Sequence, residues 1–252
     1  MAASMAVALK ALFSILTCVM VVTISQLIVT DFYKSCVDPK AWWMMTAIAN
    51  YCVYIVIVTI WFFYKESSWI KTLFFPVAMF FLGSIISCGY IAMQFFKLSP
   101  AESSKNPVFF VLARHQKGDV VGHTRRHSLV IAKVIVAALG CFMLGFLIHA
   151  IIVDGSPFHA QMLTPCMRCT LIDTLIEIVV FSVWIAYKES SWTSAIVWIL
   201  LSQCSGSIGL CVYLLRELNR LSPQQHISLI LFSQSDRDLM SSDPLLTQHS
   251  NV

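Results

Sequence analysis

The chain has 252 residues, of which 58% are apolar and only 12% carry a charge. A soluble domain has about 45–50% apolar and roughly 25% charged residues, so this composition excludes an ordinary soluble domain and predicts an integral membrane protein. The net charge of +4 is small and is not gathered into a basic stripe, which excludes nucleic acid as a partner and leaves the lipid bilayer as the predicted one.

Six apolar runs of near bilayer length follow one another along the chain. A helix needs about 20 residues to cross a bilayer. Each run is predicted to be helical, because a strand with open edges would leave backbone donors unpaired in lipid. The composition and the runs together predict an all-α, multi-pass membrane protein with six transmembrane helices. The runs cover residues 11–29, 41–63, 72–96, 134–153, 170–187 and 194–215.

The second half of the chain repeats the first at a constant offset of 123 residues, without a gap. The sequence Tyr-Lys-Glu-Ser-Ser-Trp at 64–69 recurs unchanged at 187–192. Gly-Ser-Ile at 83–85 recurs at 206–208. These matches predict two copies of one three-helix unit. Because three crossings would leave the chain on the opposite face, the copies are predicted to be inverted repeats, an arrangement common in secondary transporters.

The repeat divides the chain into four parts. The first three-helix repeat covers 1–100, a polar basic linker covers 101–127, the second repeat covers 128–223, and a polar tail covers 224–252. The tail is predicted to be disordered. Short apolar runs in the linker and the tail, at 108–112 and 229–232, are predicted to lie in the membrane interface.

Two signals about sidedness conflict. The basic residues of the linker favour a cytosolic linker and, with six crossings, both termini outside. The tail segment Asp243-Pro244-Leu245-Leu246 instead resembles an acidic dileucine sorting signal, which works only in the cytosol. The plasma membrane and the endomembranes both fit the sequence. A homo-oligomer also fits, because six helices of this size are few to enclose a pathway.

Five polar side chains inside the predicted spans are candidates for an ion or ligand pathway. An ionisable group in the bilayer is costly and marks a functional site by default. Asp173 and Glu177 are four residues apart and therefore share a helix face. His149 is predicted to lie on the same side of the membrane, and the repeat pairs these residues with polar ones in the first unit. The full set is Gln26, Asn50, His149, Asp173 and Glu177. The alternative interpretation is a helix start bathed in headgroups.

A C-x-x-C motif, Cys166 and Cys169, lies at the start of the fifth run. A structural disulfide or idle thiols is the favoured interpretation. Disulfide exchange is an alternative, because thiols near a helix start often have a lowered pKa. A zinc site with His159 and Asp173 is a further alternative. We predict no cofactor and no metal.

Two other features are predicted to be structural. In the Tyr-Lys-Glu-Ser-Ser-Trp turns, aromatic rings suit the headgroup level, Lys can snorkel to it, and Ser can cap the next helix. The alternative is a pair of symmetric gates, one per turn. Small residues in the third and sixth runs, such as Gly83 and Gly206, favour close contact between those two helices.

The duplicated unit, with its Tyr-Lys-Glu-Ser-Ser-Trp turn, its Gly-Ser-Ile helix and its Leu-Ser-Pro exit, resembles the plant family known as domain of unknown function 1475. The likeness extends from about Ala6 to Pro223. The resemblance implies the membrane fold and a plant source. It implies no activity and brings no catalytic residues.

Three classes of function stay open. A small-solute or ion transporter or channel would use the seam between the units. A non-catalytic membrane scaffold or assembly factor would suit the short loops and the lack of a large polar domain. A membrane thiol oxidoreductase would use Cys166 and Cys169. An enzyme is the least favoured of the three.

Overall fold

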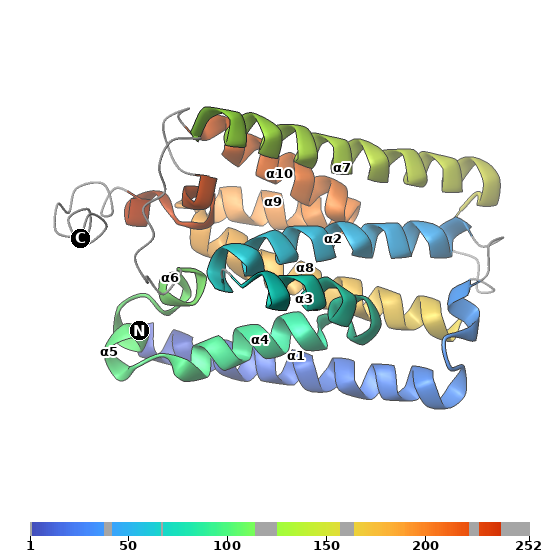
Figure 1. Ribbon diagram of the computed structural model, residues 1–252, viewed down its shortest axis with the longest axis horizontal. Helices are drawn as coiled ribbons and strands as arrows, with labels where there is room; N and C mark the ends of the chain where they lie inside the picture. The colour runs from blue at the N-terminus through green and yellow to red at the C-terminus, as the bar shows by residue number, and fades with distance from the viewer. Residues whose placement is uncertain are drawn as a thin grey trace.

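The computed structural model describes residues 2–37, 42–66, 68–113, 125–156, 164–221 and 227–237, and this part of the chain is helical almost throughout. Four of its helices are long and apolar enough to cross a membrane. Figure 1 shows them lying along one common direction. They are α1 (Ala2–Thr30), α2 (Trp42–Glu66), α7 (Arg125–Asp154) and α8 (Pro165–Lys188).

The third apolar run folds back on itself. It forms α3 (Trp69–Leu82) and α4 (Ser84–Lys97), joined at Gly83, whose φ of 60° and ψ of −152° suit glycine alone. In one continuous helix, Phe75 and Tyr90 would lie about 22 Å apart. Their ring centroids are 6.4 Å apart. The run is therefore a helical hairpin, with both ends at the same end of the bundle (Figure 1).

The sixth run repeats this hairpin. α9 (Trp192–Ser205) and α10 (Ser207–Arg220) meet at Gly206, whose φ is 58°. The rings of Trp198 and Tyr213 lie 5.3 Å apart across the hairpin. The prediction of one spanning helix per apolar run is therefore wrong for the third and sixth runs. The reason is the positive φ of one glycine, which ends each first helix halfway along an apolar stretch that is otherwise long enough to span.

The two units run in the same direction. We call "terminal end" the end of the bundle where α1 and α7 begin and α2 and α8 finish, and "loop end" the opposite one. At the loop end Cys36, in the 3₁₀-helix η1 (Lys34–Val37) that follows α1, is bonded to Cys166 at the start of α8. There too, the Trp43 N–H of α2 donates to Asp154 at the end of α7. The inverted arrangement is therefore not what the structure shows: each unit makes two long passes and one hairpin, which returns the chain to its starting end.

The centre of the bundle is formed by α2 and α8. In the most apolar 18-residue stretch of each long helix, the buried share is 44% in α2 and 50% in α8. It is only 22% in α1 and 17% in α7. The first hairpin lies against α1, α2 and α8, and the second against α7, α8 and α2. The expected contact between the third and sixth runs is thus replaced by a central contact between α2 and α8.

Short helices of the linker and the tail gather at the terminal end (Figure 1). They are α5 (Pro100–Lys105), α6 (Pro107–Leu112) and the 3₁₀-helix η3 (Ile227–Leu231). The rings of Phe109 and Phe232 lie 5.1 Å apart and join the linker to the tail. The prediction of a disordered tail does not hold for residues 227–237, because an apolar segment there packs on the second unit. Residues from 238 onward lie outside the described part.

Candidate functional site

A carboxylate from the second unit caps the hairpin of the first. Asp173 lies on α8, and its Oδ1 accepts a hydrogen bond of 2.7 Å from the backbone N–H of Ser84. Ser84 begins α4, where N–H groups lack partners within the helix. A Cβ on Gly83 would lie 2.9 Å from the same oxygen. Glycine is therefore required at this tip both for its φ and for the close approach of Asp173.

Glu177 lies one turn further along α8 and is 0% exposed. Its Oε1 accepts a hydrogen bond of 2.6 Å from the Ser87 hydroxyl. Within the described residues its Oε2 is buried without a hydrogen-bond partner, as is the hydroxyl of Tyr54. Glu177 is the thirteenth of 24 residues in α8, which places it at the middle of the helix. Burying an ionised carboxylate with one oxygen unpartnered costs several kcal/mol. A proton or a ligand on Oε2 would remove this cost.

Two tyrosines bind the other helix of the first hairpin, α3. The Tyr51 hydroxyl donates to the Met79 carbonyl at 2.8 Å, and the Tyr33 hydroxyl donates to the Phe81 carbonyl at 2.9 Å. Both carbonyls belong to the last turn of α3, where acceptors run out of partners within the helix. The Met79 carbonyl also accepts from the Gly83 N–H at 2.8 Å. The tip is therefore fixed on both sides, by hydroxyl donors on α3 and by the Asp173 acceptor on α4.

The second hairpin has the same cap with different chemistry. Asn50 on α2 is the repeat counterpart of Asp173, and its Oδ1 accepts a hydrogen bond of 2.9 Å from the N–H of Ser207. Each central helix thus caps the hairpin of the other unit. Tyr54 stands at the position of Glu177 and Leu210 at that of Ser87. Only the first hairpin is capped by a group that can carry a charge.

The five predicted pathway residues do not form one cluster. Asp173 and Glu177 lie together in the core, and Asn50 caps the opposite hairpin. His149 is exposed and packs its ring 4.1 Å from that of Trp42 near the loop end. Gln26 is exposed on α1. A span's sequence does not tell which side of the helix faces the neighbouring helices, so these two were grouped with the buried acids.

The sequence did not point to the other residues around the two acids. Tyr51, Ser84 and Ser87 become part of the site only because the first hairpin folds back against α2 and α8. One signal was present: a Gly-Ser pair inside an apolar run has the residues of a helix stop followed by a new start.

The C-x-x-C motif is divided in the structure. Cys166 is bonded to Cys36, 130 residues away, with their Cα atoms 5.3 Å apart. Cys169 is a free thiol that is 7% exposed. A thiol buried in apolar surroundings is inert compared with an exposed one, so the geometry gives the redox interpretation no support. The described residues contain no group of three ligands for a metal, and His159 lies outside them.

The Lys of each Tyr-Lys-Glu-Ser-Ser-Trp turn points inward. Lys188 is 5% exposed; its Nζ donates to the Ile230 carbonyl of η3 and lies 3.1 Å from a carboxylate oxygen of Glu217. In the first unit Lys65 donates to the carbonyls of Val111 and Ala113, at the end of α6. The predicted snorkelling is therefore wrong, because each Lys is buried and donates to backbone carbonyls of the apolar segment that follows its unit.

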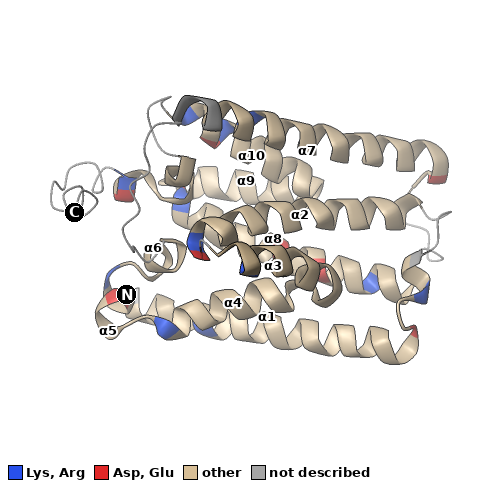
Figure 2. Cartoon of the chain, in the orientation of Figure 1, with Lys and Arg blue, Asp and Glu red and all other residues tan. Residues whose placement is uncertain are grey.

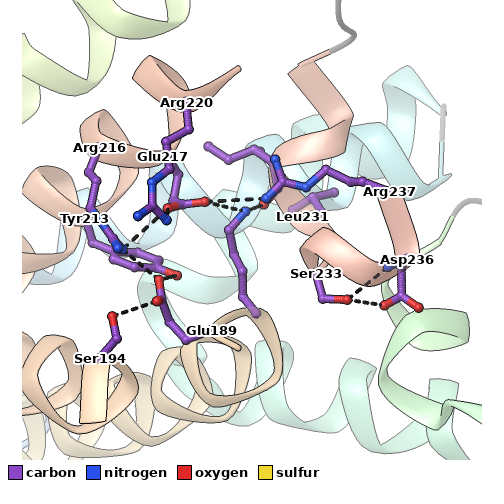
Figure 3. Close-up of polar contacts among 12 residues, drawn as sticks. Glu189, Ser194, Tyr213, Arg216, Glu217, Arg220, Leu231, Ser233, Asp236 and Arg237 are labelled. Atoms are coloured by element: carbon purple, nitrogen blue, oxygen red, sulfur yellow. Dashed lines mark hydrogen bonds and ion pairs between the residues drawn. The ribbon is translucent and has the colours of Figure 1, made fainter. Parts of the chain in front are cut away.

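The Glu of the turn binds the hairpin instead. Glu189 accepts hydrogen bonds from Arg216 at 2.7 Å, Ser194 at 2.7 Å and Tyr213 at 3.0 Å (Figure 3). Partial burial acts to raise the pKa of Glu189, but these donors outweigh it and the pKa is lowered. The predicted Ser caps are absent from these turns: Ser68 and Ser191 hold the N-cap positions of α3 and α9, but their side chains make no cap hydrogen bond.

Comparison with known proteins gives a family and no activity. Neither a search of curated proteins nor a search of solved structures returned a match. One family model, described as a protein of unknown function (DUF1475), matches residues 1–238 and so covers both units, the linker and the tail as far as residue 238. The chain belongs to the DUF1475 family.

Proposed function

We propose that the protein is an integral membrane protein with four crossings and two hairpins that enter the bilayer from the terminal end. The four long helices have the length and apolar composition of membrane spans. Each hairpin helix has 14 residues. Such a helix is about 21 Å long, which is less than the roughly 30 Å of a hydrocarbon core. The turn at each hairpin tip is tolerated at this depth because α2 and α8 provide hydrogen-bond partners for its backbone groups.

The terminal end is assigned to the cytosol on two grounds. The Cys36–Cys166 disulfide lies at the loop end, and disulfides persist in oxidising compartments. Of the 17 Lys and Arg residues, only Lys34, Lys40 and Arg168 belong to the loop end by their place in the sequence, which leaves 14 for the terminal end. Figure 2 shows most of the described ones there. Positive charge favours the cytosolic side. The basic linker and the dileucine-like tail then both lie in the cytosol, which removes their conflict.

We further propose that the protein is a transporter of ions or small solutes and that Glu177 and Asp173 bind the proton that drives it. The observation that carries this proposal is the unpartnered Oε2 of Glu177, buried at the middle of a membrane helix. Embedded carboxyl groups of this kind are the usual proton relays of pumps and transporters.

A proton fits this site better than a metal cation. Hydrogen bonds to the two acids come from the Ser87 hydroxyl and the Ser84 N–H, and an N–H cannot ligate a cation. The described residues also contain no group of three His, Cys, Asp or Glu side chains that could hold a metal ion. A proton on Oε2 neutralises the buried carboxylate and needs no cavity. Binding and release of that proton would then change how strongly α8 holds the first hairpin.

The test is proton uptake and proton flux. Purified protein in detergent should take up protons on acidification, and Glu177→Gln should lower the uptake by one proton per chain. In proteoliposomes with an internal pH dye, the same variant should abolish protein-dependent proton flux driven by a potassium diffusion potential. Glu66→Gln, an acid at the terminal end outside the pair, is the matched control. Equal uptake in the wild type and Glu177→Gln would exclude the proposal.

A non-catalytic scaffold is the second candidate, and the crosswise capping of the hairpins favours it. Asp173 and Glu177 are 3% and 0% exposed, as in a packed seam whose polar groups only hold the units in register. A scaffold predicts that Glu177→Gln changes the melting temperature and leaves proton uptake and flux unchanged. The same two measurements therefore separate the candidates.

A further inference from the structure

We propose that the first hairpin, α3–α4, is the moving gate of this protein, that protonation of Asp173 releases its tip, and that the second hairpin, α9–α10, stays fixed. This inference rests on the proposed proton-binding function and names the element that responds to the proton. It follows from a difference between the two caps, which have the same geometry and different chemistry.

The two caps form a natural pair of matched variants. Asp173 accepts from Ser84 at 2.7 Å, and Asn50 accepts from Ser207 at 2.9 Å. Both acceptors lie at the N-terminus of a helix, where the partial positive charge attracts an anion. A carboxylate gains from that charge and loses the gain when it is protonated. The amide of Asn50 has no charge to lose, so its cap does not depend on pH.

The surroundings of Asp173 contain other titratable groups that act on it. They are Tyr51 on α2, Glu177 and Cys169 on α8, and Cys88 on α4. From α1, the apolar side chain of Met20 contacts the tip, since its Cε would lie 2.8 Å from a Cβ on Gly83. None of these neighbours is a cation. The negative charge of Asp173 is therefore stabilised by the N-terminus of α4 and by hydrogen bonds.

The tip of the first hairpin separates Glu177 from the loop end. Asp173 is the ninth residue of α8 and Glu177 the thirteenth, so Asp173 and the tip that it caps lie nearer to the loop end. Tyr33, in the turn after α1 at that end, contacts the tip through the Phe81 carbonyl. A tip released from Asp173 would open Glu177 towards the loop end, whereas the closed tip covers it.

Hydrogen exchange of the two tips tests the inference. Peptides covering residues 79–88 and 202–211 are followed in the full-length protein at two pH values, with intrinsic exchange rates corrected. In the wild type, acidification should speed exchange of 79–88 at least tenfold and leave 202–211 unchanged. Asp173→Asn, which copies the natural Asn50 cap, should make 79–88 independent of pH. Asn50→Asp should make 202–211 respond to acid.

The outcomes separate this inference from the proposed function. Persistence of the acid response of 79–88 in Asp173→Asn overturns the inference, as does an equal response of 202–211 in the wild type. If Asn50→Asp does not fold, Asp173→Asn alone decides, because its side chain keeps both shape and acceptor. Loss of proton uptake in Glu177→Gln together with an unaltered response in Asp173→Asn leaves the proposed function standing and removes the gate. An Asp173-dependent response without proton flux removes transport and keeps the switch.

Discussion

At the scale of single residues, Gly83 and Gly206 turn the chain back inside apolar runs. Both have φ near +60°, at 60° and 58°, where a side chain is strained. Both are also in contact with the other unit: a Cβ would lie 2.9 Å from Asp173 Oδ1 at the first glycine and 2.7 Å from Asn50 Oδ1 at the second. The backbone conformation and the available space therefore each exclude a larger residue.

Gly83→Ala should destabilise the protein by about 2 kcal/mol or more, because it adds backbone strain and pushes Asp173 off the tip. Gly145→Ala is the control. It lies inside α7, where an added Cβ meets nothing within 4 Å, so helix propensity predicts a small gain of about 0.5–1 kcal/mol. Thermal unfolding in detergent measures both changes. Equal melting temperatures for the two variants would contradict the role given to Gly83.

At the scale of elements, the two identical Tyr-Lys-Glu-Ser-Ser-Trp turns each connect a long helix, a hairpin and a peripheral segment. In the second unit Lys188 and Glu217 are both 1% exposed in their side chains and lie 3.1 Å apart. Arg220 lies 3.0 Å from the same carboxylate, and Arg237 brings the tail to within 3.7 Å of it. The first unit has Gln94 at the position of Glu217, and there the Lys donates to backbone carbonyls at the end of α6.

Lys188→Met should therefore cost more than Lys65→Met. Removing Lys188 takes away the counter-ion of Glu217 that is itself buried, while Arg220 stays 3.0 Å from the carboxylate. The cost should therefore be about 3 kcal/mol, at the lower end of the range for a broken buried ion pair. Removing Lys65 leaves only carbonyls at the end of α6 without a donor, which costs about 1–3 kcal/mol. Unfolding in detergent gives the stabilities, and hydrogen exchange of residues 227–237 should rise only in Lys188→Met. A larger loss in Lys65→Met would show that the ion pair is not the main anchor.

At the scale of the whole molecule, the two units are joined at both ends by different bonds. The Cys36–Cys166 disulfide joins them at the loop end. At the terminal end, Asn106 of the linker donates to Asp236 of the tail at 3.3 Å, beside the contact between Phe109 and Phe232. Between these ends, Asp173 and Asn50 each reach into the other unit. The halves therefore form one folding unit.

Reduction of the disulfide, or Cys36→Ser, should lower the stability by about 2–4 kcal/mol, since a crosslink over a separation of 130 residues restricts the unfolded chain. Cys169→Ser should leave the effect of reductant unchanged, because Cys169 is a free thiol. Melting temperatures with and without reductant test this. An unaltered reductant effect in Cys36→Ser would show that another pair of cysteines carries it.

Topology follows from the number of passes. A glycosylation acceptor inserted between Val37 and Trp42 should be modified in cells, because the proposed topology places the loop end on the oxidising side. Acceptors inserted between Ala113 and Arg125, or at the C-terminus, should stay unmodified. With three crossings per unit, the linker and the C-terminus would instead lie on opposite sides, and one of those two acceptors would be modified.

Much of this arrangement followed from the sequence. Apolar runs predict helices because lipid leaves the backbone no other partners. The offset of 123 residues indicated a duplication, and the cost of burying charge in lipid singled out Asp173 and Glu177. These inferences depend on local composition and spacing, which neighbouring helices do not alter.

Only the tertiary structure decided whether an apolar run crosses the bilayer or turns back. Gly83 in an apolar stretch is compatible with a continuous helix and with a hairpin, and the Asp173 cap that favours the hairpin comes from 90 residues away. The number of passes then decided the relative direction of the two units and the partner of Cys166. Contacts between distant segments determine these features, so no reading of one segment alone could supply them.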